Sequence, residues 1–354
     1  ARIPPQRRGR APPDGRTPVT GLLGQEPATA LPTPADLLGD ALPGVLADCR
    51  AHVGPVTGIS RLTGGNVSHV FRVEGPRGSV VLKVRTAVFA RIPSLRTDPA
   101  YIADERRALE VYGALLPSMF PRVLAFHPQA HAMVMTDVFE DRRTYEDHLR
   151  ERPATADELV RLGAAVRRIH EATAGVRVAI RSQGDVWFRE HTFDFCLRGS
   201  GHPALERACE ELRTQEPQQL VLGDLAPKNL SLAGGRVVLC DLDNVHLSRP
   251  VFDVGYLLAH LLIHHVPRPD HLPALAHTLL GAYGRGRPPG PREAALLAAV
   301  AAGVVLYRLD NVRVPYDLGL RAEQRAQLRE TVIRLLDQGA FAPQELAVAL
   351  AGVR

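Results

Sequence analysis

Lysine is almost absent from this sequence: among 43 basic residues only Lys83 and Lys228 are lysines. Together with abundant alanine, glycine and proline, this bias toward arginine is typical of a GC-rich bacterial genome, in which surface lysines drift to arginine at little cost. A lysine that remains indicates a position where a compact point charge is needed and a planar guanidinium would not fit. The two lysines therefore mark places where chemistry is expected.

Cysteines, aromatic residues and long apolar runs are also scarce. The four cysteines have no metal-ligand spacing, which argues against a zinc cluster or a disulfide framework and predicts reduced thiols. The sequence shows no signal peptide and no apolar run of membrane length. We therefore expect a cytoplasmic protein with no membrane partner.

The formal net charge of +5 is concentrated at the start of the chain. The first thirty residues hold five arginines against two acids, so the remainder is close to neutral. A near-neutral remainder gives no reason to expect binding to nucleic acid. The expected partners are small molecules, bound by a monomer or a dimer.

Three regions differ in composition. Residues 1–32 are rich in proline, glycine and arginine and predict a disordered tail. Residues 33–138 predict a helix from Thr33 to about Arg50, three antiparallel strands, a helix over 102–116 and two more strands. Residues 139–354 are mainly helical. The sequence therefore predicts an α+β protein with a small antiparallel sheet followed by a larger helical part.

Residues 219–258 carry the strongest chemical signal. Gly223-Asp224 follows a short apolar run, Asn229 lies five residues later, and a second apolar run ends at Asp241. Gly234-Gly235 between the two runs predicts a hairpin. A carboxylate at Asp224 suits acceptance of a proton from an attacking hydroxyl, and Asn229 and Asp241 offer hard oxygen ligands to Mg²⁺. The spacing therefore predicts phosphoryl transfer.

This block resembles the catalytic region of the aminoglycoside phosphotransferase, choline kinase and methylthioribose kinase family, which has a two-lobed protein-kinase-like fold. The resemblance implies that Asp224 is the catalytic aspartate, Asn229 and Asp241 are metal ligands, and Asp243 is a second acid at the metal. It also implies that Asp253, in Phe252-Asp253-Val-Gly, braces the catalytic loop. Where the family usually has His, two residues before Asp224, this chain has Leu222.

The N-terminal lobe resembles the nucleotide-binding lobe of the same family through the segment GGNVSHVFRV. The resemblance implies that Lys83 binds ATP phosphates and that the backbone of the hinge binds adenine. Glu105 is favoured over Asp104 and Glu110 as the partner of Lys83. The implied nucleotide-binding residues are Gly64, Gly65, Asn66, Ser68, Lys83, Glu105, Asp137 and Val138.

Other candidates carry weaker signals. Lys228 is placed to reach the transferred phosphoryl group or, alternatively, to pair with a nearby acid. Trp187 lies in an aromatic-rich segment that suits a substrate wall as well as a satellite core, and Arg308 resembles the family's late Arg-x-Asp segment beside the acceptor. The histidines His170, His260, His264 and His265 favour a structural role over metal binding.

We therefore expect an ATP- and Mg²⁺-dependent kinase that phosphorylates a hydroxyl of a small molecule. A sugar, an aminoglycoside or a nucleoside-like natural product would be the acceptor, in biosynthesis or antibiotic resistance. Two alternatives remain open. A protein kinase is disfavoured because Asp-Phe-Gly and Ala-Pro-Glu are missing and the segment after Asp241 is short. An inactive nucleotide-binding module is favoured only by Leu222.

Overall fold

The structure is a computed structural model that describes residues 31–62, 65–139, 142–287, 289–310, 316 and 318–353. The predicted tail, apart from Leu31 and Pro32, lies outside these residues. The N-terminal lobe contains the helices α1 (Pro34–Leu38), α2 (Leu42–Val53) and α3 (Ile102–Leu115) and the strands β1 (Gly58–Arg61), β2 (His69–Gly75), β3 (Gly78–Val84), β4 (Val123–His127) and β5 (Ala132–Thr136).

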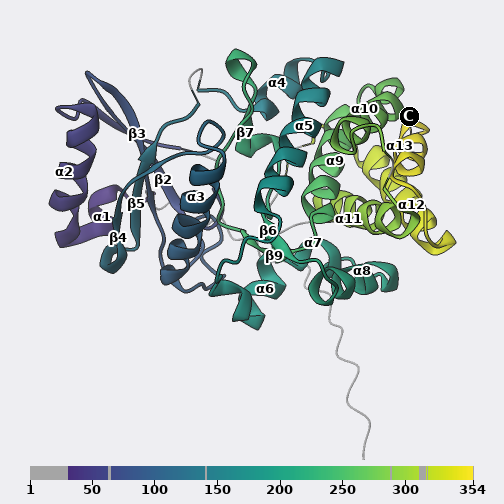
Figure 1. Cartoon of the computed structure of the whole chain (residues 1–354), viewed down its shortest axis with the longest axis horizontal. Helices are drawn as coiled ribbons and strands as arrows, with labels where there is room; N and C mark the ends of the chain where they lie inside the picture. Colours follow the sequence, from purple (N-terminus) through teal and green to yellow (C-terminus); the bar gives the residue numbers. More distant parts are fainter. Residues whose placement is uncertain are drawn as a thin grey trace, which may run out of the picture.

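The five strands form one antiparallel sheet in the order β1-β2-β3-β5-β4. Alternation along β3 sends Val80, Leu82 and Val84 into a core shared with α2. Val81 and Lys83 consequently face the opposite side of the sheet, where α3 lies between the sheet and the second lobe (Figure 1). Strand period alone therefore aims the single lysine of this lobe into the space between the lobes.

The predicted first helix is wrong in one respect, because it is interrupted. Gly39 has a left-handed φ of +47° and ends α1, and a short 3-10 turn, Gly39–Ala41, separates α1 from α2. Pro43 in the first turn of α2 has no N–H to donate, which suits a helix start. The chain thus begins a new helix where the sequence pattern suggested a continuous one.

The C-terminal lobe is mainly helical and lies on the other side of the molecule (Figure 1). Its helices are α4 (Tyr145–Glu151), α5 (Ala156–Thr173), α6 (Val186–Thr192), α7 (Phe195–Arg198), α8 (Pro203–Thr214), α9 (Val251–His265), α10 (Leu272–Tyr283), α11 (Pro291–Asp310), α12 (Ala322–Gln338) and α13 (Pro343–Ala351). Its short strands are β6 (Gln219–Val221), β7 (Leu230–Ser231), β8 (Val238–Leu239) and β9 (His246–Ser248).

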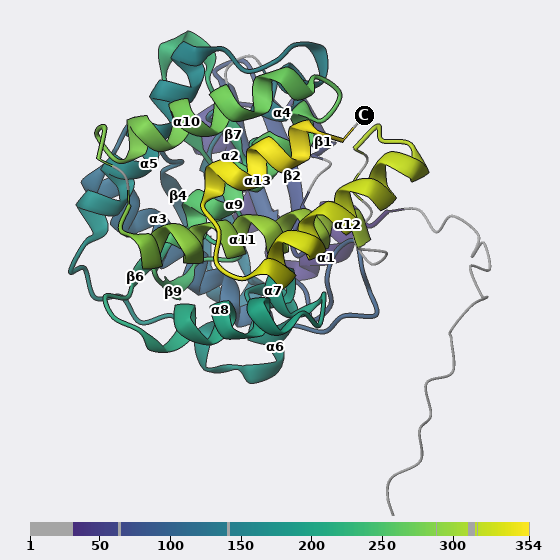
Figure 2. The ribbon, with the colours of Figure 1, turned by 90° about the vertical axis from the view of Figure 1, so that its right-hand side faces the viewer.

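Helix α9 is the centre of this lobe because it is mostly apolar and is buried on every side. Nearly all of its residues are buried, and α11 packs along it while α10 lies between α5 and α13 (Figure 2). One large apolar core runs from α3 and α5 through α9 to α13. The N-terminal end of α9, where Asp253 lies, is thereby fixed beneath the β6–β7 segment.

The β7–β8 pair is the hairpin that Gly234-Gly235 predicted, and β6 pairs with β9. Both pairs are short, yet they hold the segment from Leu222 to Asp241 between the lobes. In the described part of the chain, no helix combines the length and apolarity needed to cross a membrane.

Candidate active site

The turn that follows β6 is held in place from below by a buried carboxylate. Asp253 is fully buried, and its two oxygens accept hydrogen bonds from the backbone N–H groups of Leu222 (2.9 Å) and Gly223 (3.0 Å). His170 Nε2 lies 3.1 Å from the same carboxylate, and its Nδ1 lies 3.0 Å from the Tyr283 hydroxyl. Asp253 and His170 therefore act as the structural brace of the turn.

Gly223 is required where it stands. Its φ of +81° is left-handed, and a Cβ there would lie 1.9 Å from the carbonyl oxygen of Asn244. The close approach of the two backbones is possible only without a side chain. It sets the position of the next residue, Asp224. The buried side chain of Leu222 leaves this arrangement intact, since the turn uses only its backbone N–H.

Asp224 is surrounded by donors. Its Oδ1 accepts from the Tyr256 hydroxyl at 2.8 Å and lies 3.9 Å from Arg308 Nη2. Its Oδ2 lies 2.8 Å from Lys228 Nζ and accepts from Asn229 Nδ2 at 3.1 Å. Burial alone would raise the pKa of Asp224, but Lys228 and Arg308, with the hydrogen bond from Tyr256, hold that pKa well below its usual range. The group is a carboxylate at neutral pH.

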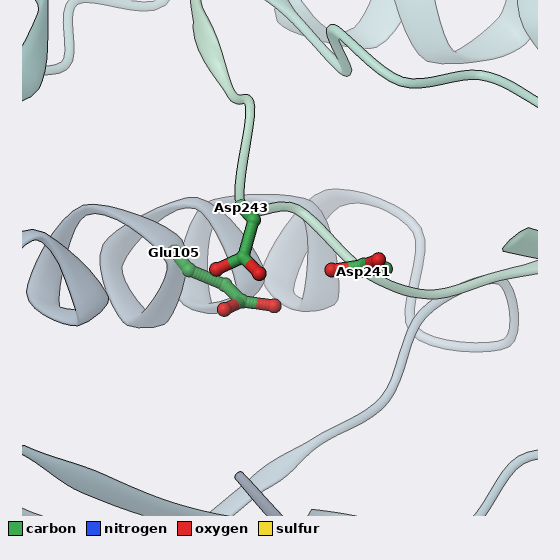
Figure 3. Close-up of side chains that lie close together, drawn as sticks. All are labelled: Glu105, Asp241 and Asp243. Carbon is green, nitrogen blue, oxygen red and sulfur yellow. The ribbon is translucent and has the colours of Figure 1, made fainter. Parts of the chain in front are cut away.

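Lys83 lies at the centre of a second cluster. Its Nζ is 2.8 Å from Glu105 Oε1 on α3, 2.8 Å from Asp241 Oδ1 and 3.2 Å from Asp243 Oδ2. Figure 3 shows the three carboxylates converging from α3 and from the segment that follows β8. Burial alone would lower the pKa of Lys83, but these carboxylates raise it well above its usual range. The ammonium is therefore permanently charged.

The segment that carries two of these acids is under local strain. Asp241 has a φ of +62°, a left-handed value that costs a residue other than glycine about 1 kcal/mol or more. The backbone N–H of Leu242 donates to Glu105 Oε1 at 3.1 Å, and Arg85 Nη1 donates to Asp243 Oδ1 at 3.4 Å. Contacts of the two residues that follow Asp241 therefore help to hold it in this conformation.

These acids suit a divalent cation by chemistry and position. Oxygen atoms of Glu105, Asp241 and Asp243 lie within 4.8 Å of one another, and carboxylate oxygens are the ligands that Mg²⁺ prefers. Glu105 Oε2 is buried and accepts no hydrogen bond from the described residues. The amide nitrogen of Asn229 points to Asp224, which leaves its oxygen as the metal-binding end. The residues present therefore fit the group.

A cleft of about 550 Å³ opens between the lobes beside this cluster. It is lined on the sheet side by Val70, Arg72, Val81 and Lys83, at the hinge by Met135, Thr136, Asp137 and Val138, and below by Lys228, Asn229 and Asp241. Val70 and Val81 offer an apolar surface of the kind that a flat heteroaromatic ring packs against. The side chain of Asp137 does not face a ligand freely, because Arg72 (2.5 Å) and Ser79 (2.8 Å) bind it.

The structure brings most of the predicted nucleotide residues to this cleft. Gly65 and Asn66 line it, while Gly64 lies outside the described residues. Ser68 instead turns its hydroxyl to Asp243, at 3.2 Å. Glu105 is the partner of Lys83, whereas Asp104 accepts the backbone N–H groups of Arg181 and Ser182.

A smaller cavity, of about 70 Å³, lies on the other side of Asp224. Lys228, Asp241, Asn66 and Arg308 line both spaces, so the cleft and the cavity meet at the catalytic turn. Trp187 lines neither of them; it is 40% exposed and stacks on His191, which does line the cavity. The aromatic segment thus reaches the site through His191 and Phe195.

Arg308 is a buried brace as well as a lining residue. Its Nε donates to His260 Nε2 at 2.9 Å and its Nη2 to the Tyr256 hydroxyl at 3.2 Å. His264 and His265 are likewise engaged, with the Tyr316 hydroxyl (2.8 Å) and the Leu261 carbonyl (2.7 Å). Each of these histidines therefore has a hydrogen-bond partner within the C-terminal lobe. Tyr256 was missed, although it lies on the side of α9 next to Asp253, three residues away.

Comparison with known proteins places this geometry in a family. No curated protein matches the sequence. Amicoumacin kinase hAmiN in complex with AMP-PNP and Ca²⁺ is 16% identical, with a TM-score of 0.59 over 86% of this chain and 95% of that one. Choline kinase LicA from Streptococcus pneumoniae is 13% identical, with a TM-score of 0.52 over 84% and 99%. A choline/ethanolamine kinase family protein from Mesorhizobium loti is 18% identical, with a TM-score of 0.51 over 88% and 98%.

These solved structures share the fold, and the sequence profile of one family matches directly. That profile, described as the phosphotransferase enzyme family, covers residues 58–297, which include the sheet, most of the cleft lining and the turn that carries Asp224. The chain therefore has a two-lobed, protein-kinase-like α+β fold and belongs to the phosphotransferase enzyme family.

Proposed function

We propose that this phosphotransferase moves the γ-phosphoryl group of ATP to a hydroxyl of a small molecule, with Mg²⁺ as the cofactor. The observation that carries the proposal is that Lys228 and Asp241 line both the cleft and the small cavity, with Asp224 in the cavity at 2.8 Å from Lys228. A nucleotide in the cleft and a hydroxyl in the small cavity would meet at these side chains. In-line transfer requires such an arrangement, because donor and acceptor oxygens lie on opposite sides of the phosphorus.

The chain's own residues would supply positioning and charge. Lys83, aimed from β3 and fixed by Glu105, would contact the phosphates, and the backbone of Asp137 and Val138 would contact adenine. Asp241, Asp243 and Asn229 would hold Mg²⁺, which when bound neutralises charge on the phosphate oxygens.

Asp224 would orient the acceptor hydroxyl and accept its proton. Its lowered pKa makes it a weak base, so we expect the proton to move late, when bonding to the phosphorus has already acidified the hydroxyl. Lys228, which pairs with Asp224 at 2.8 Å, is also within reach of the cleft. A phosphoryl group that attracted Lys228 would weaken this pair and increase the basicity of Asp224.

The test compares turnover with nucleotide binding in matched variants. Asp224→Asn keeps the shape and removes the base, so turnover should fall by about 10² to 10⁴. ATP affinity measured by calorimetry should stay nearly unchanged, because Asp224 lines the cavity and not the cleft. Asp157→Asn, at a side chain 77% exposed on α5, is the control for the substitution itself.

Asp243→Asn distinguishes the two acidic clusters. Because Asp243 contacts Lys83 and Arg85, its replacement should raise the Mg²⁺ concentration needed for half-maximal rate. If Asp224→Asn retains turnover and Asp243→Asn loses it, the base lies in the cluster around Lys83 and the assignment to Asp224 is wrong. Nucleotide binding with no transfer to any hydroxyl would support an inactive module, and transfer to protein hydroxyls alone would support a protein kinase.

A further inference from the structure

The acidic side chains that line the small cavity beside Asp224 are all paired with cations of the chain. Among the described residues that line it, the acids are Asp224, Asp241 and Asp243. Each already contacts a cation of the chain: Lys228 at 2.8 Å from Asp224, Lys83 at 2.8 Å from Asp241 and at 3.2 Å from Asp243. The lining described by the structure therefore offers no carboxylate, outside the catalytic centre, that would pair with an ammonium group on an acceptor.

The opposite wall of the cavity is apolar and comes from the N-terminal lobe. Phe89, Ile92 and Leu95, from the loop between β3 and α3, line the cavity together with Val67. Phe89 and Val67 are buried, and with Phe188 of α6 they belong to one small apolar cluster. The wall is thus packed against both lobes.

Backbone hydrogen bonds fix this loop to the nucleotide-binding segment. Ala90 N donates to Val67 O and Arg91 N to Asn66 O, both at 3.1 Å. Within the loop, Phe89 N donates to Leu95 O at 2.9 Å. The apolar wall therefore has a defined position relative to Asn66, which lines both the cleft and the cavity.

Two amide groups in the lining have unused acceptor capacity. The Oδ1 atoms of Asn66 and Asn244 are shielded from solvent and receive no hydrogen bond from the described residues. A buried carbonyl oxygen without a donor is unfavourable, and a ligand hydroxyl would supply the donor. Both asparagines line the cavity, so a rotation of either side chain would present this oxygen to a hydroxyl of a ligand.

From these features we infer that the acceptor is an uncharged, polyhydroxylated molecule with an apolar portion, and that Ile92 and Leu95 of the N-terminal lobe select it; this rests on the proposed function. An amino sugar with several ammonium groups would bring them beside Lys228, Arg308 and an apolar wall. Burying a charge without a counter-charge is strongly unfavourable. Of the acceptors that the sequence suggested, the neutral sugar-like or nucleoside-like ones are therefore retained.

The chain contains its own reporter for this cavity. Trp187 is the single tryptophan, and it stacks on His191 with ring centroids 4.2 Å apart. Because His191 lines the cavity, a bound acceptor should alter the fluorescence of Trp187. The reporter works without turnover, so binding is measurable for compounds that are not phosphorylated.

The experiment titrates the full chain, with AMP-PNP present, against two matched pairs of compounds. Kanamycin and its fully N-acetylated derivative differ in charge, and hexyl and methyl β-glucoside differ in apolar length. We expect the N-acetylated compound to bind at least about tenfold more tightly than kanamycin, and hexyl glucoside about tenfold more tightly than methyl glucoside. Tighter binding of kanamycin would overturn the inference. So would the absence of any response to all three neutral compounds at millimolar concentrations.

Variants of the wall give an independent measurement. Leu95→Asp should shift the preference between the N-acetylated compound and kanamycin by about tenfold toward kanamycin. Ile92→Ser, a milder change, should remove most of the difference between hexyl and methyl glucoside. Val186→Asp, at a position 64% exposed on α6 and outside the lining, is the control and should change neither ratio. Thermal unfolding of each variant separates a change in ligand preference from misfolding. If the Leu95 and Ile92 variants fold and both binding ratios are unchanged, the apolar wall does not select the acceptor.

Failure of the proposed function has a different signature. It would appear as no binding of AMP-PNP in calorimetry, or as no transfer from ATP to any hydroxyl compound. The ligand preference measured through Trp187 does not depend on either result. A folded protein that transfers phosphate to kanamycin and ignores the neutral compounds would keep the proposed function and refute the inference.

Discussion

Replacing Asp253 with asparagine should lower stability and activity together. Asp253 is fully buried, and each of its oxygens has its own backbone donor: Leu222 N on one and Gly223 N on the other. An asparagine amide accepts through only one of its two terminal atoms. If its oxygen takes the site near Leu222 and His170, its NH₂ group faces the Gly223 N–H. The NH₂ group and the Gly223 N–H are then two buried donors without acceptors.

The expected magnitude follows from that count. Each unsatisfied buried donor costs about 1–3 kcal/mol, so Asp253→Asn should lower the free energy of unfolding by about 2–6 kcal/mol. That is a large part of the roughly 5–15 kcal/mol typical of a folded domain. Turnover should also fall, by about 10²-fold, because displacement of Gly223 by about 1 Å moves Asp224 with it.

Urea unfolding followed by circular dichroism measures the first effect, and turnover at saturating ATP the second. His170→Asn removes one partner of the same carboxylate and should cost less, about 1 kcal/mol. Asp157→Asn, at the exposed N-terminal turn of α5, should stay within about 0.5 kcal/mol of the parent. An Asp253→Asn protein with the stability of the Asp157 control and full turnover would refute the brace.

Two further predictions concern charge. Lys83→Met should raise the KM for ATP several-fold or more, because it removes a phosphate contact. It should also lower the free energy of unfolding, because it leaves Glu105 buried without its cation. An unchanged KM for ATP would remove Lys83 from the cleft. Burial lowers the pKa of His246 and of His264 from 6.5 to about 4. Between pH 4 and pH 6.5 the unfolded chain therefore binds more protons than the folded chain. The free energy of unfolding should fall as the pH drops from 6.5 to 4, by up to about 3 kcal/mol for each histidine. His246→Asn should flatten that slope by about 1.4 kcal/mol per pH unit, and an unchanged slope in urea unfolding would contradict the assignment.

The parts of the fold and site that sequence could predict are those encoded by short-range pattern. The period of two in β3 placed Lys83 on the face away from Val80, Leu82 and Val84, as the structure shows. The spacing of Gly223, Asp224, Asn229 and Asp241 is local as well, because one turn and one hairpin carry all four. The start of the first helix at Thr33-Pro34 followed from its cap and its proline, and α3 matches the predicted helix over 102–116 to within one residue.

The features that the sequence pattern does not determine depend on contacts between residues that are far apart in the chain. Asp104 and Glu105 are adjacent on α3 and are both buried, and only the packing of α3 against Lys83 and against Ser182 assigns their roles. Tyr256 on α9 reaches Asp224 because α9 begins beneath the catalytic turn. The loop containing Phe89 and Leu95 carries no motif, yet tertiary contacts make it one wall of the small cavity beside Asp224.

The scarcity of lysine connects the two kinds of information. Lys83 Nζ touches three carboxylates at 2.8, 2.8 and 3.2 Å, which a single compact ammonium can do and a planar guanidinium, with its donors spread in a fork, cannot do in the same space. Lys228 meets Asp224 at 2.8 Å, where a longer and broader side chain would crowd Asn229 and Arg308. At most surface positions, arginine can replace lysine without a steric conflict. Both lysines lie where a compact charge contacts carboxylates of the cleft and the small cavity, so the count of lysines pointed to two of the cations that contact Asp224, Asp241 and Asp243.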